Sequence, residues 1–542
     1  MKTNLSPILR LTLAAVLVLL VGLSALQMIP PRAVPATAPA ARFSAERAMA
    51  DLQVVAREPH AAGSEAQARV RTYIIDQVKA LGLNAELETS GQIANILVRI
   101  PGSNPSLMVM VTGHYDSHPP SRGAGDDGIS VVAMLESLRV LHASPALSND
   151  ILFLFTDGEE LGWKGATAFI QAHPEAKNEV GMLLVFDARP GNAPLNLTET
   201  SPGDGWLLRQ MTGIPLSLWA GSWKNLQERN EVDTDFDIFQ PAGYTSVVFQ
   251  NEATGTRYHT ERDRVDAISP NLVQAYGQSM LALTRRFGSI DLRARTKAPD
   301  LAFFTLSLVG LVAYPYWVML ALSCLGILVW LAFVIIAWIR GRFSPGRFLL
   351  SLLGLLVGIL FCVLVAQLAW GAIKGSHAAE VAAYEGFEGS ATWQAALMAG
   401  GSLLMILFLA FLSRRLGGFP LAAASTLLFL IAGFAFNTMT KYENPLTTPW
   451  LAWPFLGGVT GMGVLLFTRR PVWKVVLLSL SALLVLAVAV PRIWMGTFTR
   501  EDAWLTVLAV CVWMELLAPQ VEAMVGSALT TGRTNGAKRR HP

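Results

Sequence analysis

The sequence predicts an α/β sandwich domain joined to membrane-spanning helices, and three observations lead to this prediction. Short apolar runs rich in β-branched or aromatic residues recur between residues 107 and 251. Long apolar segments follow one another from about residue 316 onward, and another lies near the N-terminus. Only 15% of the chain is charged, against roughly 25% in soluble domains. We therefore expect a soluble domain placed between membrane segments.

The short apolar runs are typical of buried strands, because they are continuous and bounded by turn residues. They are LMVMVTG (107–113), ILFLFTD (151–157), MLLVFDA (182–188) and SVVFQN (246–251). Helical patterns at 128–142 and 163–173 separate some of them. Strands that alternate with helices favour a largely parallel sheet between helical layers. In such sheets, ligands gather at the carboxyl ends of the strands.

The N-terminal apolar run, residues 11–27, follows Lys2 and Arg10. It fits either a cleaved signal peptide or a retained membrane anchor. We favour the anchor because the run is long and no A-x-A site follows it directly. Residues 1–28 are assigned to this anchor or signal segment, and a Pro/Ala-rich linker follows at 29–42.

The remainder of the chain divides into four predicted parts. The soluble domain occupies 43–300, and an interfacial connector occupies 301–315. A transmembrane bundle of about seven helices follows at 316–520, and a basic cytoplasmic tail ends the chain at 521–542. Several apolar segments approach the roughly 20 residues that cross a bilayer. They are 316–338, 348–369, 393–413, 419–436, 451–467, 473–490 and 503–520.

Charges in the loops orient this bundle. The basic clusters lie in alternate loops and in the tail, at Arg340, Arg342, Arg347, Arg414, Arg415, Arg469, Arg470, Lys474, Arg533, Lys538, Arg539 and Arg540. The positive-inside rule places these loops and the C-terminus in the cytoplasm, and the soluble domain on the other side. All three cysteines lie in apolar segments. A disulfide-free domain and short loops favour a bacterial inner membrane, with an organelle membrane as the alternative.

Acidic and histidine side chains stand just after several of the predicted strands. They are His114 in GHYDS, Asp126 in GAGDDG, Glu160 in DGEELG, Asp187 in FDARP and His259 in YHTERD. These residues are a sufficient ligand set for two divalent metal ions. Glu159 is left over beside them, where a general base would be needed. The pattern predicts a metal-dependent hydrolase.

These motifs, in this order, resemble the co-catalytic zinc exopeptidase family that includes leucine-type aminopeptidases and glutamate carboxypeptidase. The resemblance covers about residues 50–290. It implies a phosphorylase/hydrolase-like three-layer sandwich with a mixed, largely parallel sheet, and two zinc ions per chain. HAAGSEAQARVRTYI at 60–74 and the attached bundle resemble the branch of the endoplasmic reticulum metallopeptidases and vacuolar membrane proteases.

The resemblance also implies a role for each motif residue. His114 and Asp187 would bind one zinc ion, and Glu160 and His259 the other. Asp126 would bridge the two ions. Because geometry and availability select the metal, manganese or cobalt remains open.

Two further roles follow from the same resemblance. Glu159 would be the general base, and Asp116 would be the carboxylate that orients the imidazole of His114. His118 is an additional imidazole, interpreted as a surface residue or a substrate contact. Asp127 is expected to cap the following helix instead of binding metal.

The sequence thus predicts a membrane-bound zinc exopeptidase, foremost an aminopeptidase, that hydrolyses peptides outside the cytoplasm. One alternative is a single-zinc enzyme like glutaminyl cyclase, and another is a catalytically inactive receptor or chaperone. Retention of every ligand and of Glu159 favours the peptidase. A transporter role is disfavoured because the spans lack a charged series and a broken-helix pair. With net charge +3 and no basic patch interleaved with aromatics, no nucleic-acid partner is expected.

Overall fold

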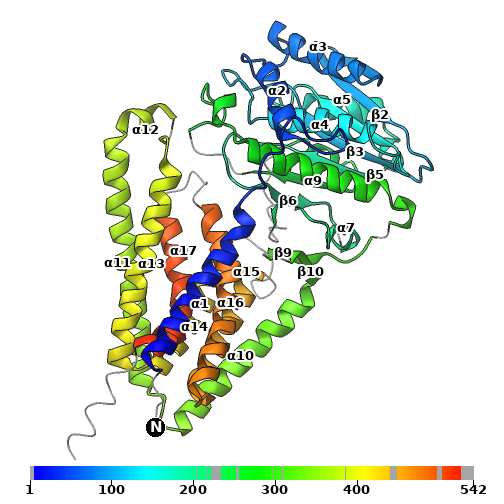
Figure 1. Cartoon of the computed structure of the whole chain (residues 1–542). Helices are drawn as coiled ribbons and strands as arrows, with labels where there is room; N and C mark the ends of the chain where they lie inside the picture. The colour runs from blue at the N-terminus through cyan, green and yellow to red at the C-terminus, as the bar shows by residue number, and fades with distance from the viewer. Residues whose placement is uncertain are drawn as a thin grey trace, which may run out of the picture. The chain divides into compact units, whose positions relative to one another are not determined.

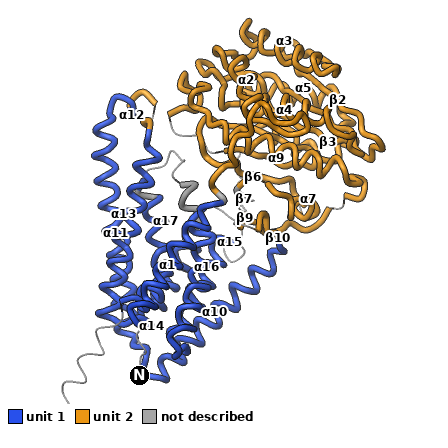
Figure 2. Tube along the Cα trace, viewed as in Figure 1, with its two compact units in different colours: residues 1–26, 314–381, 389–542 blue, residues 27–313, 382–388 orange. Residues whose placement is uncertain are grey.

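The computed structural model divides the chain into two compact units (Figures 1 and 2). It describes residues 5–525 except 204, 217, 221–232, 252–255, 296, 307–308, 385, 440–448 and 497–502. Unit 1 comprises Met1–Leu26, Tyr314–Val381 and Gly389–Pro542, and unit 2 comprises Gln27–Ala313 and Ala382–Glu388.

Unit 2 is built on an eight-stranded sheet with the order β1-β2-β4-β3-β5-β8-β6-β7. The strands are β1 Ala85–Ser90, β2 Ile93–Ile100, β3 Met108–His114, β4 Ile151–Thr156, β5 Val180–Phe186, β6 Asn196–Thr200, β7 Trp219–Ala220 and β8 Ser246–Gln250. The central strands β4, β3, β5 and β8 are parallel, whereas β1, β2 and β6 introduce antiparallel pairs. The predicted mixed, largely parallel sheet is confirmed.

Helices cover both faces of this sheet (Figure 1). Alternate residues of one strand enter different cores: Val109 and Val111 join the core with α2, α3, α4 and α9, whereas Met108 and Met110 join the core with α5, α6 and α8. This alternation follows from the two-residue period of a strand. The helices of unit 2 are α2 Ala45–Val55, α3 Glu65–Ala80, α4 Gly128–His142, α5 Lys164–Ala172, α6 Ala176–Glu179, α7 Gly205–Met211, α8 Phe236–Phe239 and α9 Pro270–Gly288.

The segment expected to be a linker forms hydrogen bonds with a helix of unit 2. The main-chain N–H groups of Ala33 and Val34 donate to the side chains of Asn271 (2.8 Å) and Gln274 (3.0 Å), both on α9. Ser44 then caps α2 through its hydroxyl. Side-chain amides thus satisfy backbone groups that a Pro/Ala-rich segment leaves without regular partners.

Within the predicted connector, β9 Leu301–Leu306 and β10 Gly310–Pro315 form a two-stranded sheet. Their side chains reach the main core of unit 2, where Leu301, Phe303 and Leu311 are buried. The segment predicted as a connector is therefore also part of the packing of unit 2.

Unit 1 is helical. Its helices are α1 Pro7–Ala25, α10 Tyr316–Ile339, α11 Pro345–Ser376, α13 Ser390–Leu416, α14 Gly418–Met439, α15 Pro449–Phe467, α16 Pro471–Gly496, α17 Ala503–Met514 and α18 Ala518–Val525, and α12 Ala378–Tyr384 follows α11. Eight stretches of the described residues are helical, long and apolar enough to cross a membrane, the first of them α1. Leu328, Leu350 and Leu360 are more than half exposed, as expected of side chains that face lipid.

The N-terminal helix packs as a member of this bundle. Leu13 of α1 is fully buried in a cluster with Val475 and Leu478 of α16. The last span extends to Val525, beyond the predicted end at 520. Most of the predicted basic tail, residues 526–542, lies outside the described residues.

Candidate metal centre

The loops at the carboxyl ends of the parallel strands collect the predicted site residues. His114 is the last residue of β3, and Asp187 directly follows β5. Glu159 and Glu160 follow β4. This edge of the sheet is where the topology of a parallel sheet places ligand sites.

The ligand atoms form two clusters that share one carboxylate. In the first, ligand atoms of His114, Asp126 and Asp187 all lie within 4.8 Å of one another. Nε2 of His114 is 3.2 Å from Oδ1 of Asp126. In the second, ligand atoms of His118, Glu160 and His259 all lie within 4.8 Å of one another. Nε2 of His259 lies 3.3 Å from Oδ2 of Asp126 and 3.3 Å from Oε2 of Glu160. Each oxygen of Asp126 therefore faces a different histidine, as a bridging carboxylate requires.

The pKa values of several of these residues are shifted strongly from their ordinary values. Burial raises the pKa of Asp187 to about 8. The nearby Arg189 lowers this pKa, and the nearby Asp126 raises it. Burial also raises the pKa of Glu159 well above its ordinary value. For His259, burial lowers the pKa, but the carboxylates of Asp126 and Glu160 outweigh it and raise the pKa to about 9. Buried carboxylates and imidazoles thus retain protons that a cation would displace.

The residues fit divalent metal ions of the zinc type. The set combines imidazole nitrogens with carboxylate oxygens, which are the ligands found in catalytic zinc sites. Oε1 of Glu160 is buried and has no hydrogen-bond partner among the described residues. A buried carboxylate oxygen without a donor is costly, and a metal ion would offset that cost.

Asp116 contacts residues of both clusters. Its carboxylate accepts hydrogen bonds from the main-chain N–H groups of Glu159 (3.1 Å) and Glu160 (3.2 Å). Nδ1 of His114 lies 3.0 Å from the main-chain oxygen of Asp116 and 3.5 Å from its carboxylate. Asp116 therefore fixes the two glutamates as well as the histidine, and its main-chain oxygen is the nearer neighbour of the imidazole.

Asp127 occupies the N-cap position of α4 but makes no capping hydrogen bond, so the expectation that its side chain caps this helix is wrong. Its carboxylate instead accepts from the main-chain N–H groups of His114 (3.2 Å) and Ala188 (2.7 Å). His114 is the last residue of β3, and Ala188 lies just after the neighbouring strand β5. Asp127 therefore ties the ends of β3 and β5 together.

Two buried aspartates of the site were not predicted. Oδ1 of Asp263 accepts from the N–H of Gly125 (2.6 Å), and Oδ2 accepts from that of Asp126 (3.2 Å). Asp235 accepts from the hydroxyl of Thr156 at 2.6 Å. The last letter of YHTERD could have indicated Asp263. No sequence pattern marks Asp235.

The imidazole of His259 lies between two rings. His118 stacks on it with ring centres 4.1 Å apart and an interplanar angle of 4°, and Tyr258 stacks at 3.8 Å and 22°. Two rings this close must occupy opposite faces. Arg189 lies 4.6 Å from the Tyr258 ring and pairs with Asp233 at 2.8 Å. His118, interpreted as a surface residue or a substrate contact, is therefore half-buried in the wall of the metal centre.

The fold and the paired clusters define a metallopeptidase domain, and comparison with known proteins agrees. Residues 95–284 match the model of Peptidase family M28. The chain carries a peptidase family M28 domain, which confirms the resemblance identified from its motifs.

Two relatives are named as a membrane protease and as a metallopeptidase. The vacuolar membrane protease of Candida albicans is 29% identical over 242 residues, which are 42% of this chain and 28% of the relative. Endoplasmic reticulum metallopeptidase 1 of Homo sapiens is 28% identical over 232 residues, 41% of this chain and 26% of the relative. The match thus spans under a third of either relative.

Solved structures that resemble the chain are more distant. An aminopeptidase from Aneurinibacillus sp. strain AM-1 is 14% identical with a TM-score of 0.39, covering 51% of this chain and 98% of that one. An Acidobacteriales bacterium glutaminyl cyclase is 20% identical with a TM-score of 0.38, covering 47% and 98%. At these values neither structure bears on the activity of this chain.

Proposed function

We propose that this protein is a membrane-bound, zinc-dependent aminopeptidase that hydrolyses peptides outside the cytoplasm with two zinc ions per chain. The observation that carries the proposal is the pair of ligand clusters joined through the two oxygens of Asp126. In this proposal, residues 43–300 are the catalytic domain and the helices from 316 to 520 anchor it in the bilayer.

The ligand roles follow from the clusters. His114 and Asp187 would hold one zinc ion, Glu160 and His259 the other, and Asp126 both. Bound zinc supplies a Lewis acid and lowers the pKa of water to about 7. Asp116 and Asp263 would keep the ligands in place through the main-chain hydrogen bonds that they accept.

Glu159 is suited to move the proton of the attacking water. Its Oε2 lies 4.0 Å from Nε2 of His114, so the carboxylate faces the first cluster. Glu159 is buried and holds no zinc ion in this proposal, so its carboxylate is available as the base. Oε2 would take a proton from water and pass it to the leaving amine.

Two features support the finer parts of the proposal. The resemblance of the motifs to aminopeptidases supports removal of N-terminal residues. The basic loops support a cytoplasmic C-terminus, with the catalytic domain in the periplasm of a bacterial cell or, alternatively, in an organelle lumen.

The test is metal content and peptide hydrolysis of the full chain in detergent, for wild type, Glu159→Gln and Glu179→Gln. Glu179 lies on α6 and is exposed, so its variant is the matched control. We expect two zinc ions per chain in all three proteins. Hydrolysis of unblocked dipeptides should fall by about 10²–10⁴-fold in Glu159→Gln alone.

Other results would overturn parts of the proposal. One zinc ion with cyclisation of N-terminal glutamine would indicate a glutaminyl cyclase. Equal cleavage of N-acetylated and free peptides would contradict aminopeptidase action. Full zinc loading without turnover of any peptide would indicate a receptor or chaperone.

A further inference from the structure

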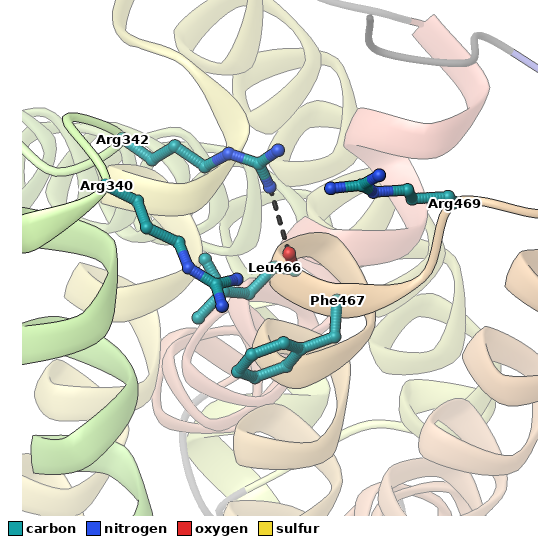
Figure 3. Close-up of a pocket in the computed structure, with 5 residues that line it drawn as sticks. All are labelled: Arg340, Arg342, Leu466, Phe467 and Arg469. Atoms are coloured by element: carbon teal, nitrogen blue, oxygen red, sulfur yellow. Dashed lines mark hydrogen bonds between the residues drawn. The ribbon is translucent and has the colours of Figure 1, made fainter.

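Three arginines line a pocket in unit 1, where two membrane-spanning helices end (Figure 3). Its volume is about 560 Å³, and its lining residues are Arg340, Arg342, Leu466, Phe467 and Arg469. Arg340 is the C-cap of α10, and Leu466 and Phe467 end α15. Arg469 lies in the short link to α16. The pocket therefore opens at the boundary of the apolar spans.

Contacts with the end of α15 hold two of these arginines over the pocket. Nη1 of Arg342 donates to the main-chain oxygen of Leu466 at 2.9 Å. The guanidinium of Arg340 lies 5.1 Å from the centre of the Phe467 ring. Figure 3 shows Arg469 extending toward Arg342 across the end of the same helix. The three cationic groups are thus gathered at one place.

The helix ends do not account for this much positive charge. The C-terminus of a helix carries roughly half a negative charge, so α10 and α15 together contribute about −1. Against this stand three guanidinium groups, and none of the described residues that line the pocket is acidic. The described lining of the pocket is therefore cationic and suited to an anion.

The surroundings indicate that the anion belongs to a lipid. Trp338 and Ile339, which precede Arg340, are 63% and 81% exposed. Tryptophan is enriched at the level of lipid headgroups, and an exposed isoleucine at the end of a span faces acyl chains. A guanidinium binds phosphate through paired N–H groups. We propose that this pocket binds the phosphate of an anionic phospholipid headgroup, independently of the peptidase site.

The test compares lipid binding of the full chain with that of two variants that lose the same charge. Arg340→Gln/Arg342→Gln/Arg469→Gln removes the pocket. Arg347→Gln/Arg414→Gln/Arg415→Gln is the control, because these arginines also lie at helix ends but not in the pocket. Native mass spectrometry would count phosphatidylglycerol and phosphatidylcholine retained from mixed micelles. Peptidase activity and thermal unfolding would verify that both variants fold.

Wild type and control should retain one tightly bound phosphatidylglycerol, and the pocket variant should bind it on the order of a hundredfold more weakly, at about fivefold per arginine. Should the triple variant not fold, Arg469→Gln alone should weaken binding about fivefold. Phosphatidylcholine should bind weakly to all.

Three results would overturn the proposal. Equal weakening in pocket and control variants would mean that only the general charge of the surface attracts lipid. Unchanged binding in the pocket variant would exclude the site. Inorganic phosphate that binds the wild type as tightly as phosphatidylglycerol would show that the pocket takes the free anion.

Discussion

The two units bury ionisable groups in different ways. Unit 2 gathers Asp126, Asp187 and Glu159 at one edge of its sheet, where a carboxylate oxygen of each lies within 4.8 Å of an imidazole nitrogen. Unit 1 buries Glu515 and Glu522 separately, and Glu522 accepts from the hydroxyl of Ser413. A buried carboxylate is costly in either place. Among the described residues, only unit 2 concentrates such groups so that a cation would compensate several at once, and that unit therefore has the features expected of a catalytic domain.

The largest expected effect comes from removing the carboxylate of Asp126, which joins the two clusters. Asp126→Ala should remove a ligand from both metal positions at once, so zinc binding and peptide hydrolysis should both fall to the level of the chelator-treated wild type. Asp76→Ala is the control, because Asp76 is exposed on α3. Zinc content and hydrolysis measured on the same samples check this. A variant that keeps both zinc ions would contradict the bridging role.

Metal binding should also depend steeply on pH. Without metal, Asp187 and His259 have raised pKa values of about 8 and about 9, so both hold a proton at neutral pH. Zinc binds only the deprotonated ligands. Affinity should therefore fall as the pH drops below about 9, and more steeply below about 8, and binding at pH 7 should release about two protons. Titration calorimetry in buffers of different ionisation enthalpy measures this release. Affinity independent of pH would show that the clusters do not bind the metal.

A smaller effect is expected from a residue that only positions Asp126. Asp263→Asn weakens the acceptor for the N–H groups of Gly125 and Asp126. Such supporting partners contribute about 10–100-fold to metal affinity, so zinc affinity should fall within that range. The control is Asp266→Asn, whose exposed side chain pairs with Arg264. Competition with a chelator measures the zinc affinity of both variants. Equal losses of affinity in the two would contradict the positioning role of Asp263.

The smallest effect should come from the ring stacked on His259. His118→Ala should weaken zinc binding roughly 2–12-fold, since an aromatic pair is worth about 0.5–1.5 kcal/mol. His118→Phe keeps a ring of similar shape without a ligand nitrogen, so it should restore the affinity. If His118→Phe bound zinc as weakly as His118→Ala, the imidazole would act as a metal ligand, and stacking would not explain its position.

These residues also show what the sequence could predict. The central strands β3, β4, β5 and β8 are buried on both faces, which makes them recognisable as continuous apolar runs. The edge strand β1, AELETS, is largely exposed, so its composition resembles a loop. Residues 301–315 read as an apolar connector because short apolar runs do not distinguish a strand from other buried segments.

The same contrast holds within the metal centre. The proposed ligands stand in short motifs at strand ends or within the loops that follow strands, and the occurrence of all these motifs in order predicts them. Asp235, Asp127 and His118 act through contacts with residues far away in the chain or across a loop. Only the folded loops define those contacts, so residue type and spacing do not predict them.

The most direct test of a dinuclear centre built on a shared carboxylate is a zinc count on three proteins. Wild type, Asp187→Ala and Asp126→Ala would be purified with their membrane helices and analysed for zinc per chain. The proposed arrangement predicts two ions in the wild type, one in Asp187→Ala and none tightly bound in Asp126→Ala. One ion in the wild type, unchanged in Asp187→Ala, would contradict it.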